Sequence, residues 1–275
     1  MRFHKSSGRV FVRQSWLNDM VLCPERARLG ITMPNMRSGS DATLMGTAVH
    51  YAIECAIDAS GNMAADEMVK IGVDKFHALQ LLEKWKETNI DPEKYEVYID
   101  SMCNAWLEGI APELEFGGRV EYQFAYPLGI EVGEWSVWCE GTIDYIDPNG
   151  VVYDWKTASR AYNAKEKQST AVQPTVYAGA VNAMGWSDFP VDFRYGIMIR
   201  QEKPKSQIVR IERNESHMRW LRHAVRPAIG MALHVGVDKP WIMNDTSALC
   251  SERWCSYWSV CKGAFLTDAD LAVRN

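Results

Sequence analysis

Two aspartates and a lysine, Asp144, Asp154 and Lys156, have types and spacing that could do chemistry. They flank Asp147-Pro148-Asn149-Gly150, a strong turn sequence between two runs that are typical of strands. If the turn is a three-residue loop, Asp147 pairs with Val151 and Asp144 lies opposite Asp154, with Cβ atoms roughly 5 Å apart. Lys156 then points to the same face. A two-residue Asn-Gly turn would instead shift the register by one residue and move Asp144 to the opposite face.

Carboxylates and an ammonium group this close together favour a divalent metal ion, because buried charges need a counter-ion. Mg²⁺ or Mn²⁺ between the carboxylates would polarise a phosphoryl oxygen and lower the pKa of a bound water. The lysine would orient that water or stabilise the charge that develops at phosphorus. This chemistry cuts a phosphodiester bond. The same residues could also be ordinary charges on an exposed hairpin, since an Asp-x-Lys triplet is common by chance.

Two further groups of residues flank the hairpin in the sequence. Gly46-Thr47-Ala48-Val49-His50 opens an apolar helical run, in which glycine allows close backbone approach and a neutral His50 suits Mn²⁺. Gln173 and Tyr177 form an i, i+4 pair on one helix face. Taken singly, these could be ordinary helix residues. Pro174 disfavours helical geometry at Gln173, so the pair works most simply if the helix begins at Gln173 with Pro174 in its first turn.

In this order, the motifs resemble the RecB-like branch of the PD-(D/E)xK nuclease superfamily, which includes the Cas4-type exonucleases. That branch carries GxxxH, GxxD, (D/E)xK and QxxxY, which read here as GTAVH, GTID, DWK and QPTVY. Ser15-Trp16-Leu17, followed by Cys23-Pro24-Glu25-Arg26, is similar to the opening of the same branch. The resemblance runs from about Ser15 to Cys261.

The resemblance implies a role for each matched residue. The implied metal ligands are His50, Asp144, Asp154 and the backbone carbonyl of Trp155. Lys156 would be the catalytic lysine, and Gln173 and Tyr177 would support the site and the DNA. Glu121, at the start of the preceding predicted strand, lies where many members keep an acid. It is a candidate to support the metal ligands without binding the metal itself.

Four of the seven cysteines predict a second metal site. Cys250, Cys255 and Cys261 form a tight C-terminal group, and Cys23 is the natural fourth thiol. We expect no signal peptide and no membrane span, hence a cytoplasmic protein (the host cytoplasm if phage-encoded), where clustered thiols are more often metal ligands than disulfides.

The identity of the second metal stays open between two occupants. The resemblance implies a [4Fe–4S] cluster held by one N-terminal and three C-terminal cysteines. Four cysteines would also hold Zn²⁺. The first C-terminal spacing here is Cys-x4-Cys, whereas that family usually has Cys-x2-Cys. Either metal would clasp the two ends of the chain and add folding free energy.

The elements that must position these residues predict one α/β domain over residues 1–275. We expect a restriction-endonuclease-like core, a central mixed sheet flanked by helices, with an N-terminal helical part and a C-terminal Cys-rich clasp (250–261 plus Cys23). The catalytic motifs span 46–184, and a helical insertion of about 63–113 would cap the site. Further helices are predicted over 15–29, 46–60, 164–184 and 214–234, and strands over 119–127, 135–147, 151–157, 193–200 and 206–212.

The charge balance says less about function than the motifs do. A formal net charge of −5 argues against a generic nucleic-acid binder. The segment 194–226 nevertheless carries nine Lys/Arg against three Asp/Glu. That run is either a phosphate-tracking surface or an ordinary solvated face.

Together these features predict a divalent-metal-dependent DNA exonuclease acting on single-stranded or free ends. Its setting would be recombination, repair or phage DNA metabolism, with a recombination or helicase partner left open. The alternatives are a structure-specific endonuclease with the same core residues, and a non-catalytic nucleic-acid-binding subunit with structural zinc.

Overall fold

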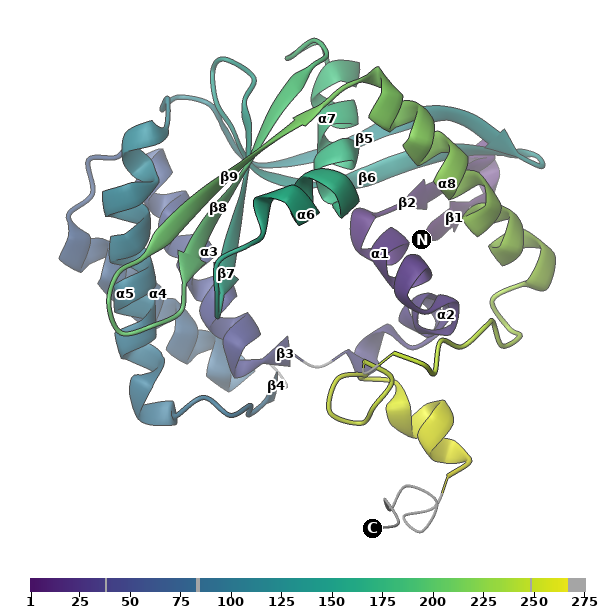
Figure 1. Ribbon diagram of the computed structural model, residues 1–275, viewed down its shortest axis with the longest axis horizontal. Helices are drawn as coiled ribbons and strands as arrows, with labels where there is room; N and C mark the ends of the chain where they lie inside the picture. The colour runs from purple at the N-terminus through teal and green to yellow at the C-terminus, as the bar shows by residue number, and fades with distance from the viewer. Residues whose placement is uncertain (38, 83–84, 248, 267–275) are drawn as a thin grey trace.

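A mixed sheet organises the chain (Figure 1). The structure is a computed structural model that describes residues 1–37, 39–82, 85–247 and 249–266. Neighbouring strands follow the order β1 (Arg2–His4), β2 (Arg9–Val12), β6 (Trp135–Ile146), β7 (Val152–Ala158), β8 (Val191–Ile199) and β9 (Ser206–Arg213). β5 (Arg119–Val132) pairs with β6. The β2–β6 and β7–β8 pairs are parallel and the other pairs of this sheet are antiparallel, which confirms the expected α/β fold with a mixed central sheet.

Helices cover the sheet through two buried apolar clusters. One cluster joins the sheet to α3 (Asp41–Asp58), α4 (Ala65–Leu82) and α5 (Tyr95–Gly109), the predicted helical insertion and the helix before it. The other joins it to α1 (Gln14–Leu22), α7 (Gln173–Ala183) and α8 (Glu215–Val235). No helix among the described residues is long and apolar enough to cross a membrane.

Two predicted helices are each divided into two. The helix expected over 15–29 breaks at Cys23, whose extended backbone separates α1 from α2 (Pro24–Thr32). Pro24 causes the break, because a residue before proline avoids helical geometry. The helix expected over 164–184 divides into α6 (Ala164–Thr170) and α7. The N-terminal strands β1 and β2 were not predicted, and β2 lies parallel to the first half of β6.

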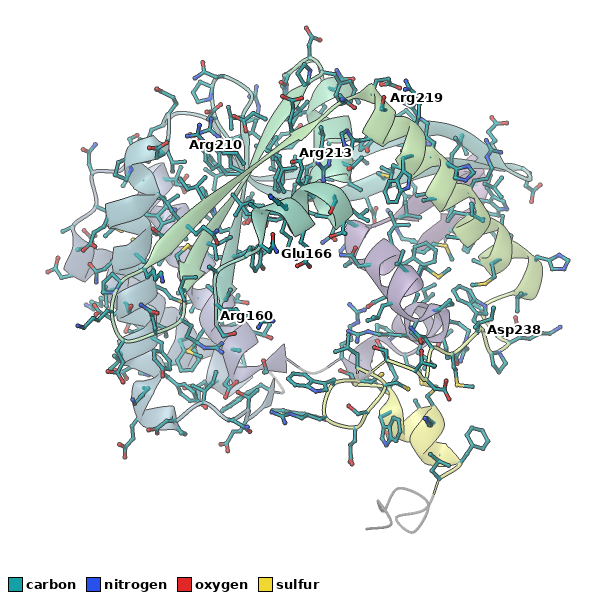
Figure 2. The ribbon with its side chains drawn as sticks, in the orientation of Figure 1. Arg160, Glu166, Arg210, Arg213, Arg219 and Asp238 are labelled. Atoms are coloured by element: carbon teal, nitrogen blue, oxygen red, sulfur yellow. The ribbon has the colours of Figure 1, made fainter. Side chains whose placement is uncertain are left out.

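The basic run of residues 194–226 is divided between internal contacts and the surface, where Lys203, Lys205, Arg210, Arg219 and Arg226 are exposed. Arg213 is buried and donates to Thr175 Oγ1 at 3.0 Å. Arg222 and Arg226 donate to the backbone carbonyls of Leu128 and Glu131. Figure 2 shows Arg210, Arg213 and Arg219 along β9 and α8, whereas Arg160 lies near the end of β7. These contacts give Arg213, Arg222 and Arg226 a structural role, whereas the other exposed members of the run remain available to solvent.

Candidate functional site

The β6–β7 turn adopts the three-residue form that brings the two aspartates together. The Asp147 amide donates to the Val151 carbonyl at 3.0 Å, and Tyr145 pairs with Tyr153. Asp147 Oδ1 accepts from the amides of Asn149 and Val151 at 2.9 and 2.8 Å, which closes the loop. Gly150 has a φ of +80°, and a Cβ there would lie 2.5 Å from the Trp186 carbonyl oxygen, so this position requires glycine.

Asp154 is the most deeply buried charge of the site. Its side chain is 2% exposed, against 30% for Lys156, and Lys156 Nζ forms an ion pair with its Oδ2. Asp154 Oδ1 accepts from Gln173 Nε2 at 2.6 Å. Both carboxylate oxygens therefore have a donor within the protein, and the charged form is held in one orientation.

Asp144 lies beside Asp154, and its side chain contacts both β7 and α3. Its Oδ2 accepts from the Trp155 amide at 2.7 Å, beyond the point where the β6–β7 ladder ends. The same oxygen lies 3.8 Å from Nδ1 of His50. The structure thus gathers Asp144, Asp154, Lys156, the Trp155 backbone and His50 at one place, although they come from three different elements.

Gln173 and Tyr177 lie on the other side of Asp154. Helix α7 begins at Gln173 with Pro174 in its first turn, as the motif required. Gln173 Nε2 lies 3.1 Å from Tyr177 Oη, and Tyr195 Oη donates to Gln173 Oε1 at 3.4 Å. Tyr195 was missed from the sequence. It enters the site because β8 pairs with β7 in a register that sets Tyr195 beside Asp154.

Gly46 allows α3 to approach β7 closely, as its place in the motif suggested. A Cβ on Gly46 would lie 2.8 Å from Thr157 Oγ1, closer than an ordinary contact. Since His50 lies one turn further along α3 and Thr157 follows Lys156, this contact sets the spacing between the histidine and the lysine.

Glu121 also lies next to the aspartates. Its neighbours Val120 and Tyr122 pair with Tyr145 and Ile143, which places Glu121 beside Asp144. Its φ of +45° is unusual for a residue with a side chain. Burial, with the charges of Asp144 and Glu54, raises the pKa of Glu121 to about 7. Glu54, one turn after His50 on α3, is a further acid that sequence reasoning missed.

The electrostatics fit a cation between these groups. Burial raises the pKa of Asp154 to about 6, with Lys156 opposing the shift and Asp144 adding to it, and burial also raises the pKa of Asp144. Burial and the charge of Lys156 lower the pKa of His50 to about 4, so its imidazole is neutral and competent as a ligand. A divalent cation would favour the ionised carboxylates. Their oxygens suit Mg²⁺ or Mn²⁺, whereas the imidazole of His50 suits Mn²⁺ better than Mg²⁺.

Hollows open on both sides of Lys156. One is lined by α3 residues including Gly46, Thr47 and His50, together with Arg200. The other is lined by Tyr162, Lys167, Gln173 and Tyr195. A phosphodiester group could therefore reach Lys156 while the nucleic-acid strand continues into the hollow on either side.

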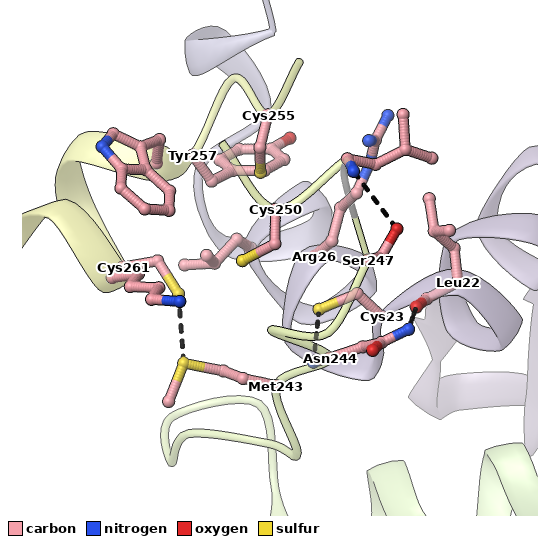
Figure 3. A pocket seen from close by; sticks show the side chains of 14 residues that line it. Leu22, Cys23, Arg26, Met243, Asn244, Ser247, Cys250, Cys255, Tyr257 and Cys261 are labelled. Atoms are coloured by element: carbon pink, nitrogen blue, oxygen red, sulfur yellow. Dashed lines mark hydrogen bonds between the residues drawn. The ribbon is translucent and has the colours of Figure 1, made fainter. Parts of the chain in front are cut away.

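The four cysteines predicted to act together line a single cavity. Cys23 comes from the break between α1 and α2, while Cys250, Cys255 and Cys261 come from the segment after α8 (Figure 3). Leu22, Leu29, Met243 and Trp258 supply apolar walls. The Asn244 amide donates to Cys23 Sγ at 3.5 Å. Burial raises the pKa of the Cys250 and Cys261 thiols.

The remaining cysteines lie elsewhere. Cys103 and Cys139 are buried, and burial raises the pKa of each thiol to about 12. Cys55 lies on α3. All seven cysteines carry free thiols. Within the described part of the chain, no three His, Cys, Asp or Glu side chains already stand at the separations of a single-ion site.

The walls of the cysteine cavity are tied to the N-terminal helices. Asn244 Nδ2 donates to the Leu22 carbonyl at 2.7 Å, and the Trp241 amide donates to Glu25 Oε2 at 2.6 Å. Arg37 donates to Tyr257 Oη at 3.3 Å. These contacts join the segment after α8 to α1, to α2 and to the residues that follow α2. The four thiols that line the cavity are donors of the type that binds zinc or iron.

Comparison with known proteins agrees with this geometry. The model of the PD-(D/E)XK nuclease superfamily matches residues 14–262. No curated protein matches the chain in sequence. The fold is similar to a crystal structure from Eubacterium rectale whose assignment as an exonuclease is provisional, with a TM-score of 0.55, 12% identity, and coverage of 91% of this chain and 92% of that one. The chain belongs to the PD-(D/E)XK nuclease superfamily.

Proposed function

We propose that this protein is a divalent-metal-dependent DNA exonuclease that acts on single-stranded ends. The observation that carries the proposal is the pair of buried Asp154 and half-buried Asp144, with Lys156 bound to Asp154 and His50 beside Asp144. Membership of the nuclease superfamily supports a nucleic acid as the substrate. Like the structural relative, the chain would belong among exonucleases.

Each side chain has a task in this proposal. Asp144, Asp154, His50 and the Trp155 carbonyl would hold Mg²⁺ or Mn²⁺. When bound, such an ion polarises a phosphoryl oxygen and lowers the pKa of a coordinated water. Lys156 orients the attacking water and stabilises the charge that develops on the phosphoryl oxygens. Gln173, positioned by Tyr177 and Tyr195, fixes the rotamer of Asp154 through the 2.6 Å hydrogen bond.

The surroundings of Lys156 support the proposed preference for ends. The hollows beside it are bordered by α3 on one side and by the segment between β7 and α6 on the other. The C-terminal segment shares a further hollow with the residues that precede α3. A strand that passes between these elements is most readily introduced from an end.

We further propose that Cys23, Cys250, Cys255 and Cys261 hold a [4Fe–4S] cluster. The support is their convergence on one cavity, the apolar walls, and the amide that donates to Cys23 Sγ, since hydrogen bonds to sulfur tune such clusters. Zn²⁺ is the rival occupant of a four-cysteine site. Iron and sulfide analysis of anaerobically purified protein, with its visible charge-transfer absorbance, decides between them. Colourless protein containing stoichiometric zinc would overturn the cluster.

The test of the activity uses end-labelled linear and covalently closed single-stranded DNA, with Mn²⁺ or with EDTA. We expect metal-dependent loss of the linear strand only, and none from Asp154→Asn, in which a similar side chain lacks the charge. Asp188→Asn, which changes an exposed aspartate, is the matched control. Cutting of the closed circles would replace the exonuclease with an endonuclease. Binding without cleavage of either substrate would make the protein a non-catalytic subunit.

A further inference from the structure

A polar hollow separates the start of α3 from the C-terminal segment, outside the carboxylate site. Three stretches far apart in the sequence line it: 39–40 and 86–89 form one wall, and 252–256 forms the other. Figure 1 shows the C-terminal segment beside β3 (Gly39–Ser40) and β4 (Trp85–Lys86). The catalytic proposal uses none of these side chains.

The wall formed by β3 and β4 is rigidly held. Asp41 is fully buried, and its carboxylate accepts from the Thr88 amide at 2.9 Å, from Thr88 Oγ1 at 2.8 Å and from Tyr95 Oη at 3.1 Å. Gly39 and Ser40 pair with Trp85 and Lys86. The segment 85–88 is therefore fixed to the first turn of α3, and a ligand that binds here meets a preorganised surface.

The facing wall presents an exposed aromatic ring with a cation against it. Trp254 is 56% exposed, and the Arg253 guanidinium lies 4.8 Å from the centre of its ring. Trp254 directly precedes Cys255, which lines both this hollow and the cysteine cavity. A metal bound at Cys255 would hold Trp254 in place.

The chemistry of the two walls fits a nucleobase better than a phosphate. Lys86 and Arg253 are balanced by Glu87 and Glu252, so the lining has little net charge with which to attract an anion. Ser40, Thr88, Asn89 and Ser256 offer neutral hydrogen-bonding groups. An exposed indole beside neutral polar groups is typical of a platform on which a base of single-stranded nucleic acid stacks.

Helix α3 leads from this hollow to Lys156. Ser40 caps α3 and lines the hollow, whereas Thr43, Gly46 and His50 line the next hollow along, together with Lys156. From residue 41 to residue 50 the helix rises about 14 Å at ~1.5 Å per residue. That length equals about four nucleotides at the ~3.4 Å spacing of a stacked strand.

We propose that Trp254, backed by Arg253, is a base-stacking platform that holds single-stranded DNA about four nucleotides from the bond that is cut. This inference rests on the proposed function and adds a substrate-binding subsite to it. Trp254 touches no reacting atom, so it is a positioning residue. It contributes to substrate affinity, and the cysteine clasp acquires a part in substrate binding through Cys255.

The experiment measures binding of a fluorescein-labelled oligothymidylate of about 12 nucleotides, long enough to span both hollows, in EDTA to prevent cleavage. Trp254→Ala is compared with Trp220→Ala, which removes an indole that is 52% exposed on α8. We expect Trp254→Ala to weaken binding by about five-fold or more, with the slope of affinity against salt unchanged, because stacking releases no counterions. Trp220→Ala should bind as the wild type does.

A conservative variant separates stacking from a disturbed fold. Trp254→Phe keeps an aromatic face and should recover most of the affinity that Trp254→Ala loses, while the visible absorbance of all three variants reports an intact clasp. In cleavage assays with Mn²⁺, Trp254→Ala should raise KM with little change in kcat.

Three results would overturn the platform. Equal affinities of Trp254→Ala and Trp220→Ala would show that Trp254 does not bind the strand. Equal weakening by Trp254→Phe and Trp254→Ala would exclude stacking. A wild-type protein that binds no oligothymidylate would remove the platform, and metal-dependent cleavage of linear single-stranded DNA by the same preparation would show that the nuclease function stands without it.

Discussion

The carboxylate site and the cysteine cavity are held together in different ways. Asp144, Asp154 and Lys156 stand on paired strands whose register is fixed by the Asp147 turn and by the β7–β8 ladder. Around the cysteines, the backbone hydrogen bonds are short-range turns, such as Cys250 to Ser247 and Cys255 to Ser251. Long-range support comes from side-chain contacts of Asn244 and Arg37, and from the Trp241 amide and the Ile242 carbonyl, which both bond to Glu25.

This difference indicates which of the two proposed metal sites would depend on its metal for structure. The sheet, with buried residues on both faces, sets the carboxylate positions without an ion. The cysteine segment lacks such a frame, so binding of the thiolates by a metal would supply much of its folding free energy. We therefore expect a divalent ion to be needed for activity alone, and the cysteine-bound metal to be needed for stability.

The largest effect is expected from Asp154→Asn, which removes the charge from the carboxylate site. Loss of a proposed metal ligand that also pairs with Lys156 should reduce the cleavage rate by about 10³-fold or more and weaken Mn²⁺ binding. The thermal unfolding midpoint should change little. Rates on labelled DNA and calorimetry with Mn²⁺ measure both, with Asp188→Asn alongside. A large loss of stability with cleavage retained would mean that Asp154 is needed for the structure and not for the reaction.

Cys255→Ser is expected to have the opposite effect, a loss of stability. Losing one thiolate should remove the visible absorbance and lower the thermal midpoint by about 10 °C or more, because metal-binding free energy is folding free energy here. Cys55→Ser, outside the cavity, is the matched control and should leave both unchanged. If the two variants were equally stable, the cysteine cavity would not be a metal-dependent clasp.

A smaller effect is expected from Gln173→Ala. Asp154 would lose the 2.6 Å hydrogen bond that fixes its orientation, and we expect roughly a ten-fold lower kcat, since hydrogen bonds to charged groups are the stronger ones. Tyr177→Phe removes only the hydroxyl at 3.1 Å from Gln173, and it should cost a few-fold at most. The opposite ranking in steady-state kinetics would show that Tyr177 does not act through Gln173.

The smallest effect is expected from Gly46→Ala. The added methyl group would press on Thr157 Oγ1 and displace α3, with His50, from β7. A modest fall in cleavage rate should follow, and Thr157→Ala in the same protein should restore the rate by making room. Failure of the double variant to recover would mean that the contact does not set the position of His50.

Local chemistry explains why much of this site could be predicted. The Asp147-Pro148-Asn149-Gly150 turn determines the register of β6 and β7, and Pro174 determines where α7 begins. Both are decided by a few neighbouring residues. The strands 135–146, 152–158, 191–199 and 206–213 agree with the expected ranges to within two residues, whereas the strand that begins at 119 continues to 132, five residues past its expected end.

Features that depend on distant pairing could not be predicted. Tyr195 reaches Gln173 only through the parallel register of β8 on β7, and Glu54 comes near Glu121 only through the packing of α3. The hairpin of β1 and β2 is short, and it is stabilised by β6, far along the chain. The basic residues after Arg194 were ambiguous because sequence does not show which guanidinium groups meet a carbonyl inside the fold.

The most direct test of the central claim is to separate metal binding from cleavage in Lys156→Ala. Lys203→Ala, which changes an exposed lysine, is the control. Mn²⁺ binding is measured by calorimetry and cleavage on end-labelled single-stranded DNA with the same preparations. The account predicts that Lys156→Ala still binds Mn²⁺ but cleaves at least about 10²-fold more slowly, while Lys203→Ala resembles the wild type. Full cleavage by Lys156→Ala would contradict the assignment of this site.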